Sequence, residues 1–283
     1  MARLFGRTWR VRIDTIQFTE LDCSFTVEKS TKREPNKCSL RVWNLTAEHR
    51  AQLESLSVTR QRGPGRIRVE LEAGYGDRTS LLFRGDLRHA TTVREGPDLV
   101  TELEGEDGGR AVLWSRVNRS FPPGTRVDQV VRACAAAMGV GAGNTDELLR
   151  GARFEGTGTT FPEGTVLRGQ AAEELERLLR GMGLRYSIQN GVLQILQRGR
   201  ALQETAIRLS PDTGLVDRPE VNVDGTVTAT CLLLPDLYPG RQVQFDGVNV
   251  AGTWRVEKVK YQGDTFGSEW YAHMECKALI RRT

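Results

Sequence analysis

The sequence predicts a mainly β protein of the α+β class, in which two antiparallel β units flank a small α+β unit. Apolar and polar residues alternate along several stretches of both outer thirds, as they do in strands with one buried face. The 30 glycines among 283 residues favour many short strands and turns. Longer runs of helical apolar spacing lie in the middle third. We therefore expect domains at 1–115, 116–200 and 201–283.

The first β unit is expected to carry a helical insertion near 46–56. The strand "NKCSLRVW" ends at the corner Trp43-Asn44, and Thr46 is placed to cap the helix that follows. Before it, "TWRVRID" and "CSFTV" alternate as strands, and after it "RIRVELEA" does so most regularly. A turn at Glu95–Asp98 divides a long hairpin over Leu81–Glu104.

The middle unit is predicted to contain two helices and a hairpin. Thr125, with Asp128 three residues later, resembles a capping box, and Gly139 ends that helix. The segment 139–164 is glycine-rich and expected to be irregular. A second helix is expected over 169–182, and Asn190-Gly191 is a two-residue hairpin turn between alternating strands.

The last unit returns to strands and closes with a hairpin over Thr253–Ala278. In its first strand the inward-facing positions are even at Trp254 and Val256 but odd at Val259. An extra residue must therefore interrupt the alternation, and a β-bulge is expected near Glu257-Lys258. Trp270 lies on the inward side of the second strand.

No residue pattern indicates catalysis, a metal site or a cofactor site. His49, His89 and His273 lie in different expected elements, and the five cysteines form no CxxC pair. "GVGAGN" has Asn144 where a dinucleotide-binding loop needs glycine. "EGEDGG" lacks the register of a calcium loop and is expected to be a solvated turn. We therefore predict that the protein is not an enzyme.

Charge and hydropathy narrow the possible partners. The net charge is +4, but cations and carboxylates alternate and form no basic block, which disfavours nucleic-acid binding. No run approaches the roughly 20 apolar residues of a membrane helix, and the start of the sequence has no secretory signal. Assembly in a reducing cytoplasm without membrane insertion is therefore expected.

The segment "PNKCSLRVWNL" and the polar helix after it resemble the N-terminal region of bacteriophage baseplate hub proteins. These are the tail-tube-fold hubs of contractile tails, related to late control protein D and the VgrG group. "AAEELERLLRGMGLRYSIQNGVLQIL" is similar to their middle unit. "VTATCLLLPDLYPGRQVQF" and "GTWRVEKVKYQGDTFGSEWYAHMEC" resemble their second barrel.

The resemblance implies two tube-like β-barrels per chain and a homotrimeric structural hub in the virion tail baseplate. Expected partners are the tail tube protein, the central spike protein, the wedge proteins, and a tape-measure protein or DNA passing through the lumen. Trp43, Trp254 and Trp270 are expected to be structural core residues, and "RIRVELEA" is a candidate strand at an interface between chains. The alternatives are a DNA- or polysaccharide-binding β module and a tail-associated cell-wall hydrolase.

Overall fold

The computed structural model describes residues 6–62, 66–149, 159–246 and 250–280, and they divide into two compact units. The sheet unit lies within Met1–Ser30, Asn36–Glu106 and Ala201–Thr283, so it combines the first and last thirds of the chain. The helical unit lies within Thr31–Pro35 and Asp107–Arg200.

The sheet unit consists mainly of strands, with one α-helix and one 3-10 helix (Pro211–Thr213) among its described residues. Its elements are β1 (Arg7–Ile13), β2 (Ile16–Phe18), β3 (Cys23–Ser30), β4 (Asn36–Trp43), α1 (Ala47–Arg62), β5 (Arg68–Tyr75), β6 (Arg78–Glu95), β7 (Asp98–Asp107), β14 (Ile207–Leu209), β15 (Glu220–Val221), β16 (Val227–Leu232), β17 (Gln242–Asp246), β18 (Ala251–Asp264) and β19 (Trp270–Ala278).

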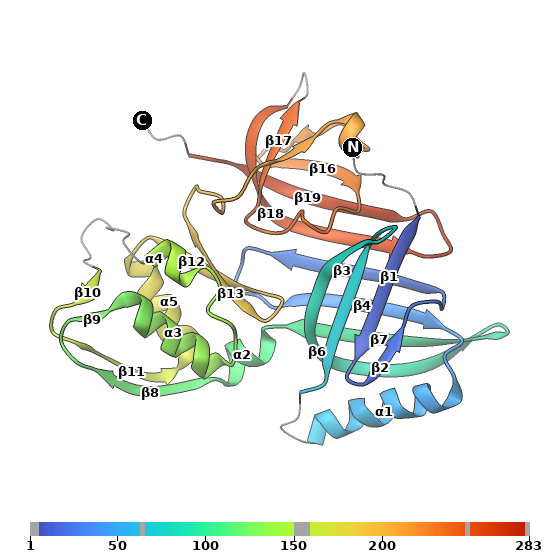
Figure 1. Ribbon diagram of the computed structural model, residues 1–283, viewed down its shortest axis with the longest axis horizontal. Helices are drawn as coiled ribbons and strands as arrows, with labels where there is room; N and C mark the ends of the chain where they lie inside the picture. Colours follow the sequence, from blue (N-terminus) through green and yellow to red (C-terminus); the bar gives the residue numbers. More distant parts are fainter. Residues whose placement is uncertain (1–5, 63–65, 150–158, 247–249, 281–283) are drawn as a thin grey trace. The chain divides into compact units, whose positions relative to one another are not determined.

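These strands form one continuous sheet (Figure 1), in the order β15-β16-β19-β18-β3-β4-β7-β6-β5-β1-β2. The neighbouring strands whose register is known pair antiparallel, whereas β14 pairs parallel with β17 outside this path. The strand β18 joins the two thirds, because its first half pairs with β17 and its second half with β3. Among the described strands no barrel closes, since the path has free ends at β15 and β2. The resemblance implies two tube-like β-barrels, whereas the described strands form one shared sheet.

The strand β5 contains most of "RIRVELEA", and its position corrects a prediction. Seven residues of β5, Val69 to Tyr75, pair with β1, and the other edge of β5 pairs with β6. Both edges of β5 are thus occupied within the chain, so it cannot add a strand to another subunit. Its regular alternation of charges reflects a central strand with one solvated face.

Three register shifts of the kind that β-bulges produce interrupt the sheet, including one between Leu87 and His89 of β6 against β7. The register of β18 against β19 shifts between Val256 and Lys258, which confirms the bulge expected there. A second shift between β5 and β6 leaves Leu82 outside the paired register, and the buried Lys29 of β3 donates a hydrogen bond from Nζ to its carbonyl oxygen at 3.0 Å. Lys29 therefore satisfies a buried acceptor next to the bulge.

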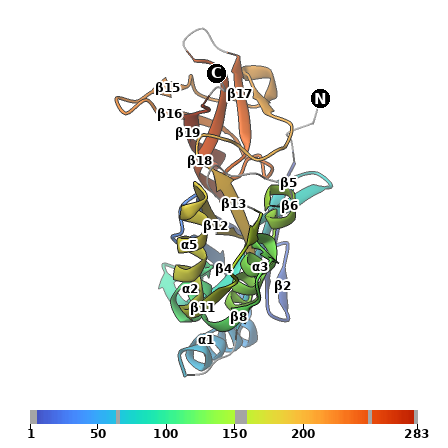
Figure 2. The same ribbon diagram turned by 90° about the vertical axis from the view of Figure 1, so that its left-hand side faces the viewer.

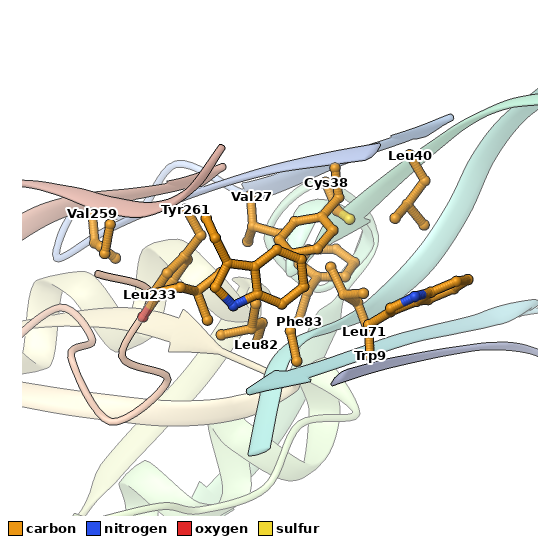
Figure 3. Packing of buried hydrophobic residues seen from close by; sticks show 14 of the residues in the cluster. Trp9, Val27, Cys38, Leu40, Leu71, Leu82, Phe83, Leu233, Val259 and Tyr261 are labelled. Atoms are coloured by element: carbon orange, nitrogen blue, oxygen red, sulfur yellow. The ribbon is translucent and has the colours of Figure 1, made fainter. Parts of the chain in front are cut away.

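The core of the sheet unit takes its side chains from both ends of the chain (Figure 3). Residues from β1, β3, β4, β5 and β6, such as Val27 and Phe83, meet residues of the last third, such as Leu233 and Tyr261. The hydroxyl of Tyr261 donates a hydrogen bond to the carbonyl of Leu237 inside this core. Because one cluster includes both thirds, neither third has a separate core.

The corner before α1 depends on Asn44. Its φ is +53°, and its backbone N–H bonds to the carbonyl of Leu99 at 2.8 Å. Its side chain accepts from the N–H of Leu99 at 3.1 Å and donates to Asp98 at 2.9 Å. The helix α1 then starts with Thr46 accepting a hydrogen bond from the N–H of His49, as expected for a cap, and packs against β6 (Figure 1).

The helical unit packs two main helices against short strands around a separate core. Its elements are α2 (Gly109–Trp114), β8 (Arg116–Phe121), β9 (Thr125–Arg126), α3 (Val127–Met138), α4 (Thr145–Leu149), β10 (Thr160–Phe161), β11 (Thr165–Gln170), α5 (Ala171–Gly181), β12 (Leu184–Gln189) and β13 (Val192–Gln197). Figure 1 shows β8 and β11 as a two-stranded ribbon beside α3 and α5.

The helical unit contains one confirmed turn and two corrections. Asn190 and Gly191 both have positive φ in the β12–β13 turn, as the sequence predicts. The cap residue of α3 is Arg126, which forms no side-chain cap bond, because Thr125 instead donates to the carbonyl of Pro122. The segment 139–164 also contains regular structure in α4 and β10.

Candidate functional site

The histidines do not form a site. His49 lies on α1, His89 on β6 and His273 on β19. Of the three imidazole rings, only that of His273 has a described polar contact. Its Nδ1 lies 3.1 Å from the hydroxyl oxygen of Thr230. In the part of the chain that the structure describes, no group of three or more His, Cys, Asp or Glu side chains is placed to hold a metal ion.

The cysteines are buried free thiols. All five are inaccessible to solvent, in β3, β4, α3, β16 and β19. Burial raises the pKa of Cys134 to about 12 and that of Cys231 to about 12. Because the thiolate is the nucleophilic form, these groups are inert at neutral pH and contribute to packing.

The acidic segment "EGEDGG" is used structurally. Glu106 pairs with Arg88 of β6 at 3.0 Å. Asp107 is buried and accepts hydrogen bonds from the N–H groups of Asn190 and Gly191, at 2.6 and 2.9 Å. The turn expected to be solvated is therefore the end of β7, and Asp107 fixes the β12–β13 turn.

The segment "GVGAGN" packs against the edge of β13. The side chain of Asn144 both donates to and accepts from the backbone of Ile195, each at 2.8 Å. Gly143 has a φ of +56°, and a Cβ there would lie 1.7 Å from the carbonyl oxygen of Leu193. The glycine and asparagine are therefore explained by close approach of the loop to a strand edge.

The solvated faces of the sheet are lined by paired charges. On the β1–β5–β6 face, Arg10 pairs with Glu72 at 3.1 Å, and Arg84 pairs with Glu70 at 2.7 Å. On the β18–β19 face, Lys258 pairs with Glu275 at 2.9 Å. Such cross-strand pairs neutralise cations within the chain, so these faces offer little free positive charge to a polyanion.

The three tryptophans singled out from the sequence differ in burial. Trp270 is 1% exposed, and its ring packs edge-on against Phe25 with centroids 5.4 Å apart. Trp254 is half-buried at the margin of the same core. Trp43 is also half-buried and lies under the guanidinium of Arg41, 5.2 Å from its ring centroid.

The β18–β19 turn is held by a residue that sequence patterns did not indicate. Arg7 of β1 donates to the carbonyls of Asp264, Gly267 and Ser268 at 2.9, 2.6 and 2.8 Å. The carboxylate of Asp264 accepts from the N–H groups of Phe266 and Gly267. Phe266 is 88% exposed on this fixed turn. No short motif reveals a contact between residues more than 250 positions apart.

The described helices include none with the length and apolarity that crossing a membrane requires.

Comparison with known proteins gives one family. A model of the family described as "Baseplate hub gp41" matches residues 11–276. No curated protein sequence matches the chain.

Several solved structures share the fold at low sequence identity. The 43 kDa tail protein of prophage MuSo2 from Shewanella oneidensis has a TM-score of 0.63 and 9% identity, with 96% of this chain and 98% of that chain covered. The tail protein from Neisseria meningitidis MC58 has a TM-score of 0.58 and 9% identity, with 96% and 97% covered. The Escherichia coli c3393 protein, a type VI secretion component described as similar to the T4 tail proteins gp27 and gp5, has a TM-score of 0.56 and 11% identity, with 95% and 77% covered.

Proposed function

This chain belongs to the baseplate hub gp41 family, and from that premise we propose that three copies form a ring joining a six-fold tail tube to a three-fold central spike. The single observation that carries the proposal is the family match over residues 11–276, which includes strands from both ends of the shared sheet. The tail proteins of prophage MuSo2 and of Neisseria meningitidis share the fold over nearly their whole length, which supports a place for this chain in the virion tail.

The two outer thirds, 1–115 and 201–283, would act as two tube-like modules, with 116–200 as a peripheral unit. Three copies would then present six modules to a six-fold tube, so the ring would match the tube on one side and the spike on the other. Each outer third contributes a long hairpin to the sheet, β6–β7 and β18–β19, which supports two related modules. A ring of this kind would bury an interface on the order of 2,000 Å² or more per pair of chains.

The role would be structural and without substrate turnover. A conduit wall must let DNA or a tape-measure protein pass without strong adhesion. The intramolecular charge pairs on the solvated sheet faces, such as Arg10–Glu72, would weaken attraction to phosphate if one of these faces lines the lumen. Wedge proteins would contact the outer side of the ring.

A reconstruction of the assembled tail tip tests the proposal. The chain should form a three-fold ring coaxial with the tube. Finding the chain as a fibre, as a sheath subunit or off the axis would contradict it. A steep salt dependence of DNA affinity would favour the DNA-binding alternative, and a cleared band on a cell-wall zymogram would favour the hydrolase.

A further inference from the structure

One exposed patch of the helical unit combines apolar side chains with arginines. We call it the ribbon patch, because it lies on the β8–β11 ribbon and the α2 end that adjoins it. The amide of Gln170 in β11 donates to the carbonyls of Val112 and Leu113 and so fixes that end of α2 to the ribbon. The patch comprises Leu113, Trp114, Arg116, Val166 and Arg168, all exposed.

A second exposed patch lies on the sheet unit and combines apolar side chains with negative charge. We call it the acidic edge, because it follows the free edge of the sheet beside β16, where Figure 2 shows β15. It comprises Asp212, Val216, Asp217, Glu220, Val221 and Val223, all exposed. One cation, Arg218, lies within the same segment.

The acidic edge is rigid. The N–H groups of Val216 and Asp217 both point to the carbonyl of Thr230 in β16. The turn after β15 is fixed by Asn222, whose side chain donates to the hydroxyl of Thr226 at 2.9 Å. Val223 at this turn is fully exposed. This uncovered sheet edge presents apolar side chains and backbone groups that a partner surface can cover.

Among the described residues, the charges of both patches have no ion-pair partner. Several arginines of the sheet strands, such as Arg10 and Arg84, pair with nearby carboxylates. In contrast, no described carboxylate forms an ion pair with Arg116 or Arg168, and no described cation does so with the acidic edge. The two patches are thus complementary in charge, and each exposes apolar side chains.

We propose that the acidic edge of one copy docks on the ribbon patch of the next copy, an inference that rests on the trimeric ring proposed above. A cyclic trimer needs a head-to-tail interface, in which each chain contributes two different surfaces. The acidic edge of the sheet unit and the ribbon patch of the helical unit are two such different surfaces. Trp114, 76% exposed, and the flanking arginines are of the residue types that dominate binding energy in interfaces.

Charge reversal tests the docking in the full-length chain by light scattering over a range of concentrations. The wild type should be trimeric. Arg116→Glu with Arg168→Glu should raise the concentration at which half the chain is trimeric at least about tenfold, because like charges then face each other. Asp217→Arg with Glu220→Arg should do the same. The chain carrying all four substitutions should recover the trimer.

A matched control reverses Arg78→Glu and Arg94→Glu, two exposed arginines of the sheet unit outside both patches. This control changes the net charge as much as the ribbon-patch variant and should stay trimeric. Unchanged melting temperatures of all variants would separate loss of docking from loss of folding.

The outcomes distinguish the docking from the ring itself. If the wild type is trimeric and either reversed variant remains so, the docking is wrong and the ring stands. If both reversed variants dissociate and the fourfold variant does not recover, the pairing of these two patches is wrong. If the ribbon-patch variant stays trimeric but loses affinity for a 20-nucleotide single-stranded oligonucleotide, the patch binds nucleic acid instead. A wild type that forms no trimer, either alone or in the tail tip, contradicts the proposed function first.

Discussion

Replacing Trp270 with alanine removes the largest fully buried side chain of the chain's described residues. Two contacts would be lost with the ring: the edge-on packing against Phe25, and the guanidinium of Arg7 that lies 5.6 Å from the ring centroid. Removing a buried Trp typically costs about 3–5 kcal/mol of unfolding free energy, because a cavity remains that the surrounding strands only partly fill. Since β18, β19 and β3 meet around this ring, relaxation into the cavity is limited.

The measurement is thermal unfolding of Trp270→Ala, followed by circular dichroism. For a domain of about 150–250 residues, each kcal/mol lowers the melting temperature by roughly 2–4 °C. The variant should therefore melt roughly 6–20 °C below the wild type, and ring assembly should fail with it.

Trp114→Ala is the matched control, because Trp114 is 76% exposed and its loss should leave the melting temperature nearly unchanged. A Trp270→Ala chain that melts like the wild type, yet does not assemble, would refute the assignment of Trp270 to the core. That result would make Trp270 an interface residue.

Three further predictions follow from buried groups. Glu257→Ala should lower the unfolding free energy by up to about 3–5 kcal/mol in a denaturant titration, because it removes a carboxylate that accepts a hydrogen bond from the buried guanidinium of Arg255; a change below about 1 kcal/mol would contradict the importance of this buried pair. Gly143→Ala should lower the melting temperature, since the new methyl group would overlap the carbonyl of Leu193, and an unchanged melting temperature would show that the loop can move away from β13. Burial raises the pKa of Cys134 to about 12, above the usual value near 8.5. The protonated thiol therefore stabilises the folded state below pH 8.5, and this contribution is lost as the pH rises toward 12. A thiol reagent should label Cys134 only when the chain unfolds, and rapid labelling of the native chain would contradict the prediction.

Local pattern was sufficient for the individual strands and turns. The alternation in "TWRVRID" and "CSFTV" places Val11, Phe25 and Val27 inside, because a strand with one solvated face must alternate with a period of two. After Val256 the inward-facing positions of β18 change from even to odd, and this change predicts the bulge because regular alternation cannot produce it. The Asn190-Gly191 turn follows from the positive φ that both residues tolerate. These features depend on neighbours in the sequence and are therefore visible in it.

Features that depend on distant partners were decided only by the tertiary structure. The pairing of β18 with β3 merges the outer thirds into one sheet, and nothing local to either strand specifies that neighbour. Arg7 holds a turn near the far end of the chain, and Asn144 covers a strand some 50 residues away. The charge pairing of the sheet arginines, and its absence at Arg116 and Arg168, likewise depends on which strands lie side by side. The sequence by itself therefore determined the alternation of each strand, whereas long-range hydrogen bonding and packing decided which surfaces remain free to assemble.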